Sequence, residues 1–209
     1  MTPPALSQAA RGSNPMAGAA PRWSPSDLRR LDWRFLLPDP SIGDVACLAH
    51  PGSSLATALR VVCRTVIHLD PRVPAAARHP LVVVDRADLD ALRAAARAVS
   101  PDGWLYAEFL RRPRDLQAWL LHPARCRREL RRLGFDRIVA SWHRPDFENS
   151  VEITPLHERA AGSFAMSRAP VNAKRRLQLA GGRFLHRTGL LPLVVPCFSL
   201  LAHRVQPSR

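Results

Sequence analysis

Polar residues directly follow three β-branched and apolar runs of the sequence, and their types suit the binding of a nucleotide. The runs, each with the residues after it, are 45–49 with His50, Gly52 and Ser53, 61–69 with Asp70, and 81–84 with Asp85. A carboxylate accepts hydrogen bonds from ribose hydroxyls, and a small-residue turn that opens a helix directs backbone amides toward a ligand. A site therefore forms if the runs are parallel strands whose carboxyl ends meet at one edge of a sheet.

The first of these turns belongs to a predicted βαβ unit. Val45–Ala49 is short, apolar and unbroken, as expected of a strand covered on both faces. Ser53 or Ser54 can cap a helix that begins near Leu55. Val61–Leu69 then predicts the second strand, which the acidic residue closes.

The turn lacks the glycine-rich pattern of a strong nucleotide-binding match. Ala49, Pro51 and Ser53 stand where glycines are usual, and only Gly52 remains. An ordinary βαβ crossover with a polar turn is the alternative interpretation, because a fold by itself does not define a site.

The net charge of the chain invites a polyanionic partner. The 209 residues suffice for one sizeable core, and they carry a formal charge of +14 with 46% hydrophobic and 23% charged residues. Lys174 is the only lysine, however, and a chain rich in arginine, alanine and proline is what a GC-rich genome produces without selection for nucleic acid. The arginines at 111, 112, 114 and along 125–132 are therefore interpreted as solvated faces, and a nucleic-acid or membrane-surface binder is the less favoured hypothesis.

Cysteine usage and the absence of targeting patterns predict a cytoplasmic protein. The four cysteines, Cys47, Cys63, Cys126 and Cys197, form no C-x-x-C and have no histidines clustered beside them, so neither a metal site nor a disulfide is expected. Residues 1–25 are rich in Pro, Ala, Ser and Gly and predict a disordered leader, not a secretory signal. The apolar stretch 190–202 is interrupted by prolines and is too short to cross a bilayer.

Helices and strands alternate along the rest of the chain. The predicted elements are helix 86–99, strand 104–109, helix 115–133 ending at Gly134, strand 137–143, helix 172–188 ending at Gly189, and a closing strand 193–205. Residues 144–190 form an insertion over one end of the sheet, irregular up to about 171. Only 71–80, with three prolines, separates the second and third runs, which leaves no room for a strand and a crossover helix.

A segment of aromatic and apolar residues precedes the first strand. Ser26 can cap a short helix there, and residues 31–38 contain Trp33 and Phe35. Packing over the edge of the sheet is the favoured interpretation of this segment, since buried aromatic rings mostly contribute area. A lid with one of these rings near a ligand is the alternative.

Taken together, the runs and turns resemble the class I S-adenosylmethionine-dependent methyltransferases. VACLAHPGS stands where that family has its acidic-apolar-glycine loop, VIHLD resembles the second strand with the ribose-binding acid, and LVVVD resembles the fourth strand. VSPDGWLYAEF resembles the turn and fifth strand, and LRRLGFDRIVASWHRP resembles the helix, turn and sixth strand. The resemblance implies a Rossmann-like three-layer α/β sandwich over residues 26–205, with a tail at 206–209. Its sheet would be mostly parallel, with an antiparallel last strand, and shortened around the third strand.

The resemblance also implies S-adenosylmethionine as the cofactor and a small-molecule acceptor. The implied cofactor-binding residues are Ala49, His50, Gly52 and Ser53 beside the methionine and ribose portions, Asp70 on the ribose hydroxyls, and Asp85 at the mouth of the cleft. No catalytic base follows from it, because methyl transfer needs mainly alignment.

Three residues near strand ends are candidates for a base, namely His50, His143 and Glu108. A structural hydrogen-bonding role is the alternative for the histidines. The start of the insertion, with Trp142, His143, Phe147 and Glu148, would form the wall around the acceptor.

Departures from the family pattern leave two main hypotheses. Cys47 replaces the family's usual acid, and Pro51 has no amide to donate. The leading hypothesis is a methyltransferase that acts on a small molecule or a sugar-containing metabolite. The alternative is a non-catalytic binding or partner protein of the same fold that has lost the cofactor.

Overall fold

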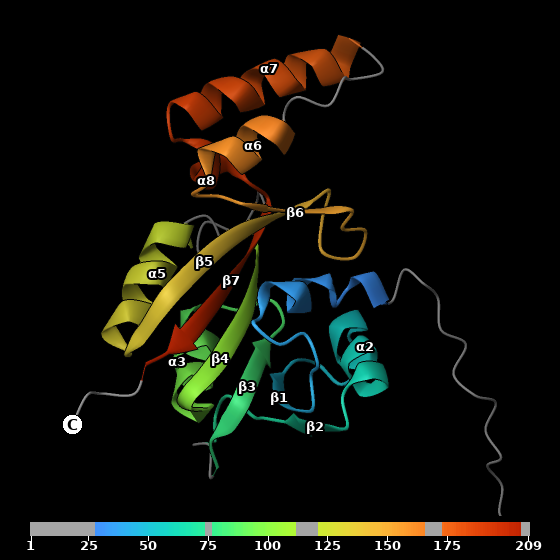
Figure 1. Ribbon diagram of the computed structural model, residues 1–209, viewed down its shortest axis with the longest axis vertical. Coiled ribbons are helices and arrows are strands. Elements are labelled where there is room, and N and C mark those ends of the chain that lie inside the picture. Colours follow the sequence, from blue (N-terminus) through green and yellow to red (C-terminus); the bar gives the residue numbers. More distant parts are fainter. Residues whose placement is uncertain (1–27, 74–76, 112–120, 166–172, 206–209) are drawn as a thin grey trace, which may run out of the picture.

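A computed structural model describes residues 28–73, 77–111, 121–165 and 173–205 of the chain (Figure 1). The elements in chain order are η1 (Asp32–Leu36), β1 (Asp44–Leu48), α2 (Ser54–Val62), β2 (Thr65–His68), β3 (His79–Val84), α3 (Leu89–Ala98), β4 (Val99–Leu110), α5 (Pro123–Arg132), β5 (Phe135–Arg144), β6 (Glu152–Pro155), α6 (Arg159–Ala165), α7 (Ala173–Arg187), α8 (Leu191–Val194) and β7 (Cys197–Arg204).

The strands form one seven-stranded sheet in the order β2-β1-β3-β4-β7-β5-β6. Neighbours from β2 to β4 pair in parallel, whereas β7 lies antiparallel between β4 and β5, and β6 pairs antiparallel with β5. No strand or helix lies between β2 and β3 in the described residues. The predicted Rossmann-like α/β sandwich with an antiparallel last strand, shortened around the third strand, is confirmed.

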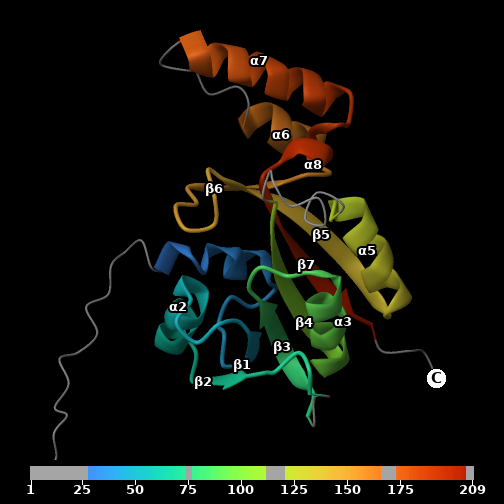
Figure 2. The same ribbon diagram turned by 180° about the vertical axis from the view of Figure 1, so that it is seen from behind.

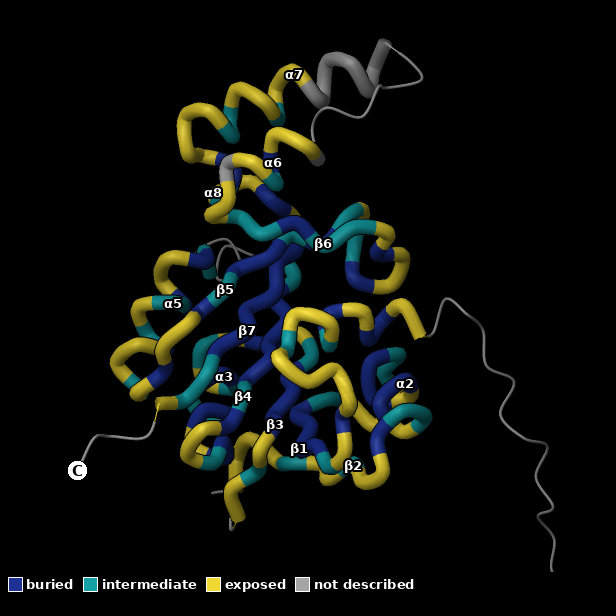
Figure 3. Tube along the Cα trace, in the orientation of Figure 1, coloured by how far each residue is buried: buried dark blue, intermediate teal, exposed yellow. Residues whose placement is uncertain are grey.

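Two apolar layers cover the two faces of the sheet (Figures 1 and 2). One layer contains residues of α3 and α5, and the other contains residues of α2 together with Leu31 and Trp33 from the start of the described chain. Colouring by burial shows the central strands buried between these layers (Figure 3). The segment before β1 therefore covers one face of the central strands, where Trp33 stacks on Tyr106 of β4, and not the edge of the sheet as the favoured interpretation of residues 31–38 predicted.

Local sequence signals set the ends of the helices. Ser53 accepts a hydrogen bond from the Ala56 amide and caps α2, and Asp88 caps α3 in the same way. Gly134 and Gly189 follow α5 and α7 with φ of +85° and +73°, a backbone conformation that a Cβ atom disfavours.

Several predicted boundaries were wrong. Val61 and Val62 belong to α2 and not to the second strand, because capping and burial continue the helix through residues whose β-branching alone favours a strand. Cys63 therefore ends a helix. Strand β4 begins at Val99 rather than at 104, since the expected turn at 100–103 continues as extended chain. Helix α3 begins at Leu89 rather than at 86, after its cap at Asp88.

The insertion contains more regular structure than the sequence predicted. Residues 152–155 form β6 on the edge of the sheet, and α6 follows. The closing strand begins at Cys197 rather than at 193, because Pro192 fits the first turn of α8. The first part of the predicted helix 115–133 and the cap at Asn172 lie outside the described residues.

Candidate functional site

The topology defines where a ligand would bind in this sheet. The chain passes from β1 to β2 on one side and then crosses to β3 on the other side of β1. Open α/β sheets bind ligands at the carboxyl ends of the strands, at the point where the strand order reverses. The candidate site is therefore the crevice above the carboxyl ends of β1, β3 and β4, hereafter the central crevice.

A side chain from the start of the described chain lies in the central crevice. Arg30 donates from Nη1 to Glu108 Oε1 at 2.5 Å and from Nη2 to Glu108 Oε2 at 2.6 Å. Its Nε donates to Ser54 Oγ, at the start of α2, at 3.3 Å. Arg30 is 5% exposed and Glu108 is fully buried. The guanidinium thus bridges the beginning of α2 and the end of β4.

Two further carboxylates face the same guanidinium. Asp85 Oδ1 lies 3.7 Å from Arg30 Nη2 and has no hydrogen-bond partner among the residues that the structure describes, although its side chain is buried. Glu148 Oε2, from the insertion, lies 3.7 Å from Arg30 Nε and is half exposed. Three carboxylates thus surround one guanidinium, and one buried carboxylate oxygen has no donor.

Burial and charge oppose each other within this cluster. Burial raises the pKa of Glu108 to about 6, although the charge and hydrogen bonds of Arg30 act in the opposite direction. Burial lowers the pKa of Arg30, but the charge and hydrogen bonding of Glu108 outweigh it and hold that pKa above its ordinary value. At neutral pH the two groups therefore form a charged pair with two parallel hydrogen bonds.

Aromatic rings enclose the pair. Trp33 stacks on Tyr106 with ring centroids 3.9 Å apart, and the Tyr106 hydroxyl donates to Glu108 Oε1 at 2.9 Å. The pKa of Tyr106 is raised, first by burial and then by the charge of Glu108, so the hydroxyl keeps its proton. The Phe147 ring lies 5.2 Å from the Arg30 guanidinium carbon. Of the two aromatic residues proposed for a lid, Trp33 is buried in the core and Phe35 is 62% exposed.

Backbone amides of the predicted cofactor loop donate hydrogen bonds within the loop itself. Gly52 N donates to the His50 ring at Nδ1 (3.2 Å), and Ser53 N donates to the His50 carbonyl (2.9 Å). The Ser53 hydroxyl accepts from Ala56 N in the helix cap. Ala49 is half-buried at the end of β1. The loop follows the carboxyl end of β1, beside the central crevice, but the Gly52 and Ser53 amides are already bonded within the turn.

The two predicted acids differ in their surroundings. Asp85 lies in the central crevice, as described above. Asp70 is exposed beyond the end of β2, where its Oδ1 accepts from Arg72 N at 2.9 Å. This contact closes a local turn that aspartate commonly forms.

The candidate bases are poorly placed for proton transfer at neutral pH. His143 is buried with its Nε2 at 2.9 Å from Ser199 Oγ. Burial, and then the charge of Arg30, lower its pKa to about 3. Glu108 is held by Arg30, and His50 is exposed and accepts from its own turn. A general base works best with a pKa near the operating pH, so His143 does not suit that role. The pKa of Glu108 lies nearer to neutral pH, but both of its carboxylate oxygens accept hydrogen bonds from Arg30.

Sequence reasoning missed Arg30. The sequence contains 31 lysine and arginine residues, and nothing in the pattern around Arg30 distinguishes it from the rest. One signal was present, because Glu108 lies inside a strand that is otherwise apolar. A buried carboxylate there requires a cation or a hydrogen-bond donor, but the sequence does not say which residue supplies it.

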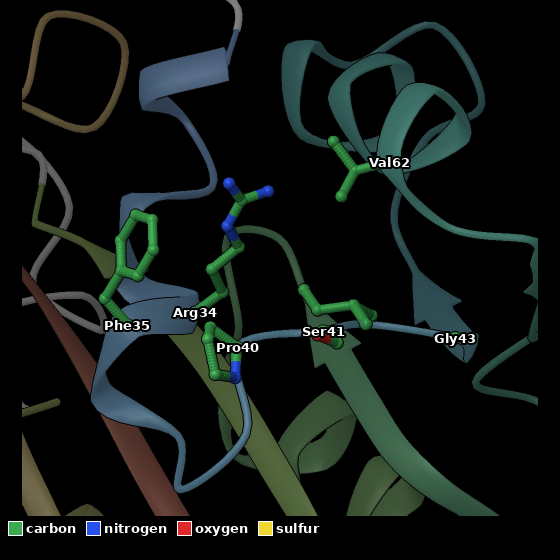
Figure 4. A pocket seen from close by; sticks show the side chains of 7 residues that line it. Arg34, Phe35, Pro40, Ser41, Gly43 and Val62 are labelled. Atoms are coloured by element: carbon green, nitrogen blue, oxygen red, sulfur yellow. The ribbon is translucent and has the colours of Figure 1, made fainter.

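Two grooves lie away from this site, near the amino end of β1. One, of about 410 Å³, is lined by Val62 and residues between 34 and 43, including Arg34, Phe35 and Pro40 (Figure 4). The other, of about 360 Å³, is lined partly by the same segment and by Leu81 and Trp104. Neither contains a predicted cofactor-binding residue.

Other classes of site receive no support from the described residues. Among them, no three His, Cys, Asp or Glu side chains are grouped so that they could hold a metal ion. The part of the chain that the structure describes contains no helix long and apolar enough to cross a membrane. All four cysteines are free and buried, and burial raises the pKa of Cys47 to about 12, so this thiol stays protonated.

Comparison with known proteins finds similar solved structures but no matching sequence. No protein-family model and no curated protein matches the sequence, whereas 104 chains of solved structures match. One is an S-adenosylmethionine-dependent methyltransferase from Archaeoglobus fulgidus, at 11% identity and a TM-score of 0.46, with 86% of this chain and 94% of that chain covered. Another is phosphoethanolamine N-methyltransferase 2 from Haemonchus contortus in complex with S-adenosyl-L-methionine, at 13% identity and a TM-score of 0.46; the match covers 86% of this chain but only 52% of that one.

The chain is thus structurally similar to many class I S-adenosylmethionine-dependent methyltransferases at low sequence identity, and it has their Rossmann-like α/β fold. The strand order and pairing of this chain show the fold, and the similarity does not show an activity. The [4+2]-cyclase SpnF also matches, at 13% identity and a TM-score of 0.45 over 85% of this chain and 80% of that chain. Activity has to be argued from the residues of the site.

The residues of the central crevice do not fit the cofactor that this fold implies. A buried guanidinium, bonded to Ser54 and Glu108, fills the space between the start of α2 and the ends of β3 and β4. The Gly52 and Ser53 amides of the adjacent loop are bonded internally. In this conformation S-adenosylmethionine would have to displace Arg30.

Proposed function

We propose that this chain is a non-catalytic binding or partner protein with a methyltransferase fold, whose cofactor crevice is closed by its own Arg30. The observation that carries the proposal is the buried pair of hydrogen bonds, at 2.5 and 2.6 Å, between Arg30 and Glu108. The sequence alone favoured the enzyme, and this ion pair reverses that order.

Magnitudes support the proposal. Removing one member of a buried ion pair costs about 3–5 kcal/mol. A ligand that expels Arg30 without replacing its bonds to Glu108 has to offset this cost. Since about 1.4 kcal/mol corresponds to a factor of ten, its affinity falls roughly a hundred- to a few-thousand-fold. A cofactor that would otherwise bind at micromolar concentration then binds only in the millimolar range.

Calorimetric titration of the full chain with S-adenosylmethionine and S-adenosylhomocysteine tests the proposal. We expect no binding heat up to about millimolar ligand, the range that the displacement cost above predicts. The Arg29→Ala variant is the matched control, because Arg29 is the exposed neighbour of Arg30 and should behave like the wild type. Micromolar binding of either ligand to the wild type would overturn the proposal.

A second candidate, a methyltransferase for a small molecule, is favoured by the two predicted acids. Asp70 is exposed at the end of β2, and Asp85 has a buried oxygen without a donor. In this case Arg30 withdraws when the cofactor binds, and Asp70 accepts from the ribose. S-adenosylhomocysteine would then bind the wild type, and Asp70→Ala would abolish the binding.

The charge of the surface does not favour a polyanion binder. Arg111, one of the arginines of that hypothesis, is 5% exposed and donates to the carbonyls of Leu121 and Pro192. Arg112 and Arg114 lie outside the described residues. The arginines along α5 are mostly exposed, as expected of a solvated helix face, and Arg132 lies within 3.8 Å of Glu129.

A further inference from the structure

The central crevice shows the features of a recognition site for one kind of cation. Glu108 receives two parallel hydrogen bonds from a planar guanidinium, an arrangement that an ammonium group cannot reproduce. Asp85 and Glu148 add negative charge at 3.7 Å on two other sides. The ring of Phe147 lies at a distance suited to a cation–π contact.

The Glu108 carboxylate is also held by side chains other than Arg30. Tyr106 donates to Glu108 Oε1 and stacks on Trp33, so the carboxylate is held from behind by residues of the core. Phe147 packs beside His143, with ring centroids 4.7 Å apart. Such support keeps the acceptor oriented when its partner leaves, which is what a preorganised site requires.

We propose that the central crevice is a guanidinium-binding site formed by Glu108, Asp85, Ser54 and Phe147, and that Arg30 is its built-in occupant. The ligand class is a guanidinium group, either on a small molecule or on an arginine side chain. This inference rests on the proposed function, because it assigns to the non-catalytic crevice the ligand that it holds. The ionic contact with Glu108 thereby adds to the packing of Leu31 and Trp33 in holding this segment on the sheet.

Replacement of Arg30 should expose the site to an added ligand. In Arg30→Ala the carboxylates remain while the guanidinium is lost. We expect ethylguanidine to bind this variant at least about tenfold more tightly than ethylammonium, since only ethylguanidine can make both hydrogen bonds to Glu108. Calorimetry and the shift in melting temperature measure the binding of each ligand. We expect no binding to Arg29→Ala, in which Arg30 still fills the crevice.

A second substitution identifies the acceptor. In Arg30→Ala/Glu108→Gln the carboxylate that accepts two parallel hydrogen bonds is lost, and the preference for ethylguanidine over ethylammonium should disappear. If Arg30→Ala is too unstable to purify folded, the yield of refolding is measured with each ligand. Recovery with ethylguanidine and not with ethylammonium supports the site, and recovery with neither or with both equally overturns it.

S-adenosylmethionine serves as the competing ligand in the same experiment. If it binds Arg30→Ala at micromolar concentration and ethylguanidine does not, the crevice is a masked cofactor cleft and the guanidinium site is wrong. Failure of the proposed function is a different result, because it requires the cofactor to bind the wild type. Failure of the guanidinium site is therefore observed with Arg30→Ala, and failure of the proposed function is observed with the wild type.

Discussion

The two predicted acids at the carboxyl edge of the sheet have different environments. Asp70, beyond the end of β2, is exposed and accepts from the backbone of its own turn. Asp85, after β3, is buried against Arg30 and leaves one oxygen without a donor. Both directly follow a run that predicts a strand, so their sequence positions are equivalent. They differ because Arg30 reaches the centre of the sheet and β2 lies at its margin.

This comparison teaches that an acid at a strand end marks the edge where ligands bind but not whether the place is free. The outer part of the edge keeps an accessible carboxylate. In the inner part Glu108 is already paired with a side chain from a distant part of the chain, and Asp85 lies beside that pair. A cofactor that spans both parts of the edge would find an exposed carboxylate at Asp70 and a carboxylate already bonded to Arg30 at Glu108.

The largest expected effect is that of Arg30→Ala. Removal of the guanidinium leaves Glu108 buried without its counter-charge, so the free energy of unfolding should fall by about 3–5 kcal/mol. Arg29→Ala, the exposed neighbour, should change it by less than about 0.5 kcal/mol. Urea unfolding of both variants measures the contrast. Equal effects would mean that the inner part is not held by Arg30.

An intermediate effect is expected from pH. Burial raises the pKa of Glu108 to about 6, above an unfolded value of about 4.3. The folded state therefore binds this proton more tightly, and the stability it contributes is present below about pH 4.3 and lost as the pH rises through 6.

Comparison with Glu108→Gln separates that contribution from those of the acids outside the cluster, which titrate alike in both proteins. The stability of the wild type relative to the variant should fall by up to about 2 kcal/mol between pH 4 and 7. Urea unfolding at several pH values provides the measurement. A difference that grows with pH would show that pairing with Arg30, and not burial, dominates at Glu108.

The smallest effect is expected at Asp70. Asp70→Ala removes one exposed hydrogen bond to Arg72 N, which is worth about 0.5–1 kcal/mol, whereas Asp70→Asn keeps an acceptor and should be nearly neutral. Thermal and urea unfolding test both variants. A loss at Asp70 as large as that at Arg30 would remove the distinction between the outer and inner parts of the edge.

Much of the fold followed from local patterns. The apolar run before Ala49 and the cap at Ser53 predicted β1 and the start of α2, and Gly134 and Gly189 marked the ends of two helices. Predictions failed where tertiary contacts outweigh propensity. Val61 and Val62 extend a helix, and the insertion supplies the edge strand β6, whose pairing with β5 no short-range pattern could reveal.

The sequence by itself determined the order of most strands and helices outside the insertion and the presence of acids after two strands, because periodicity, caps and turn residues act over a few positions. Only the tertiary structure decided that Arg30 meets Glu108, 78 residues further along the chain. A buried carboxylate requires a partner but does not specify one among many arginines. The choice depends on how the segment before β1 crosses the sheet, and this is set by the packing of Leu31 and Trp33.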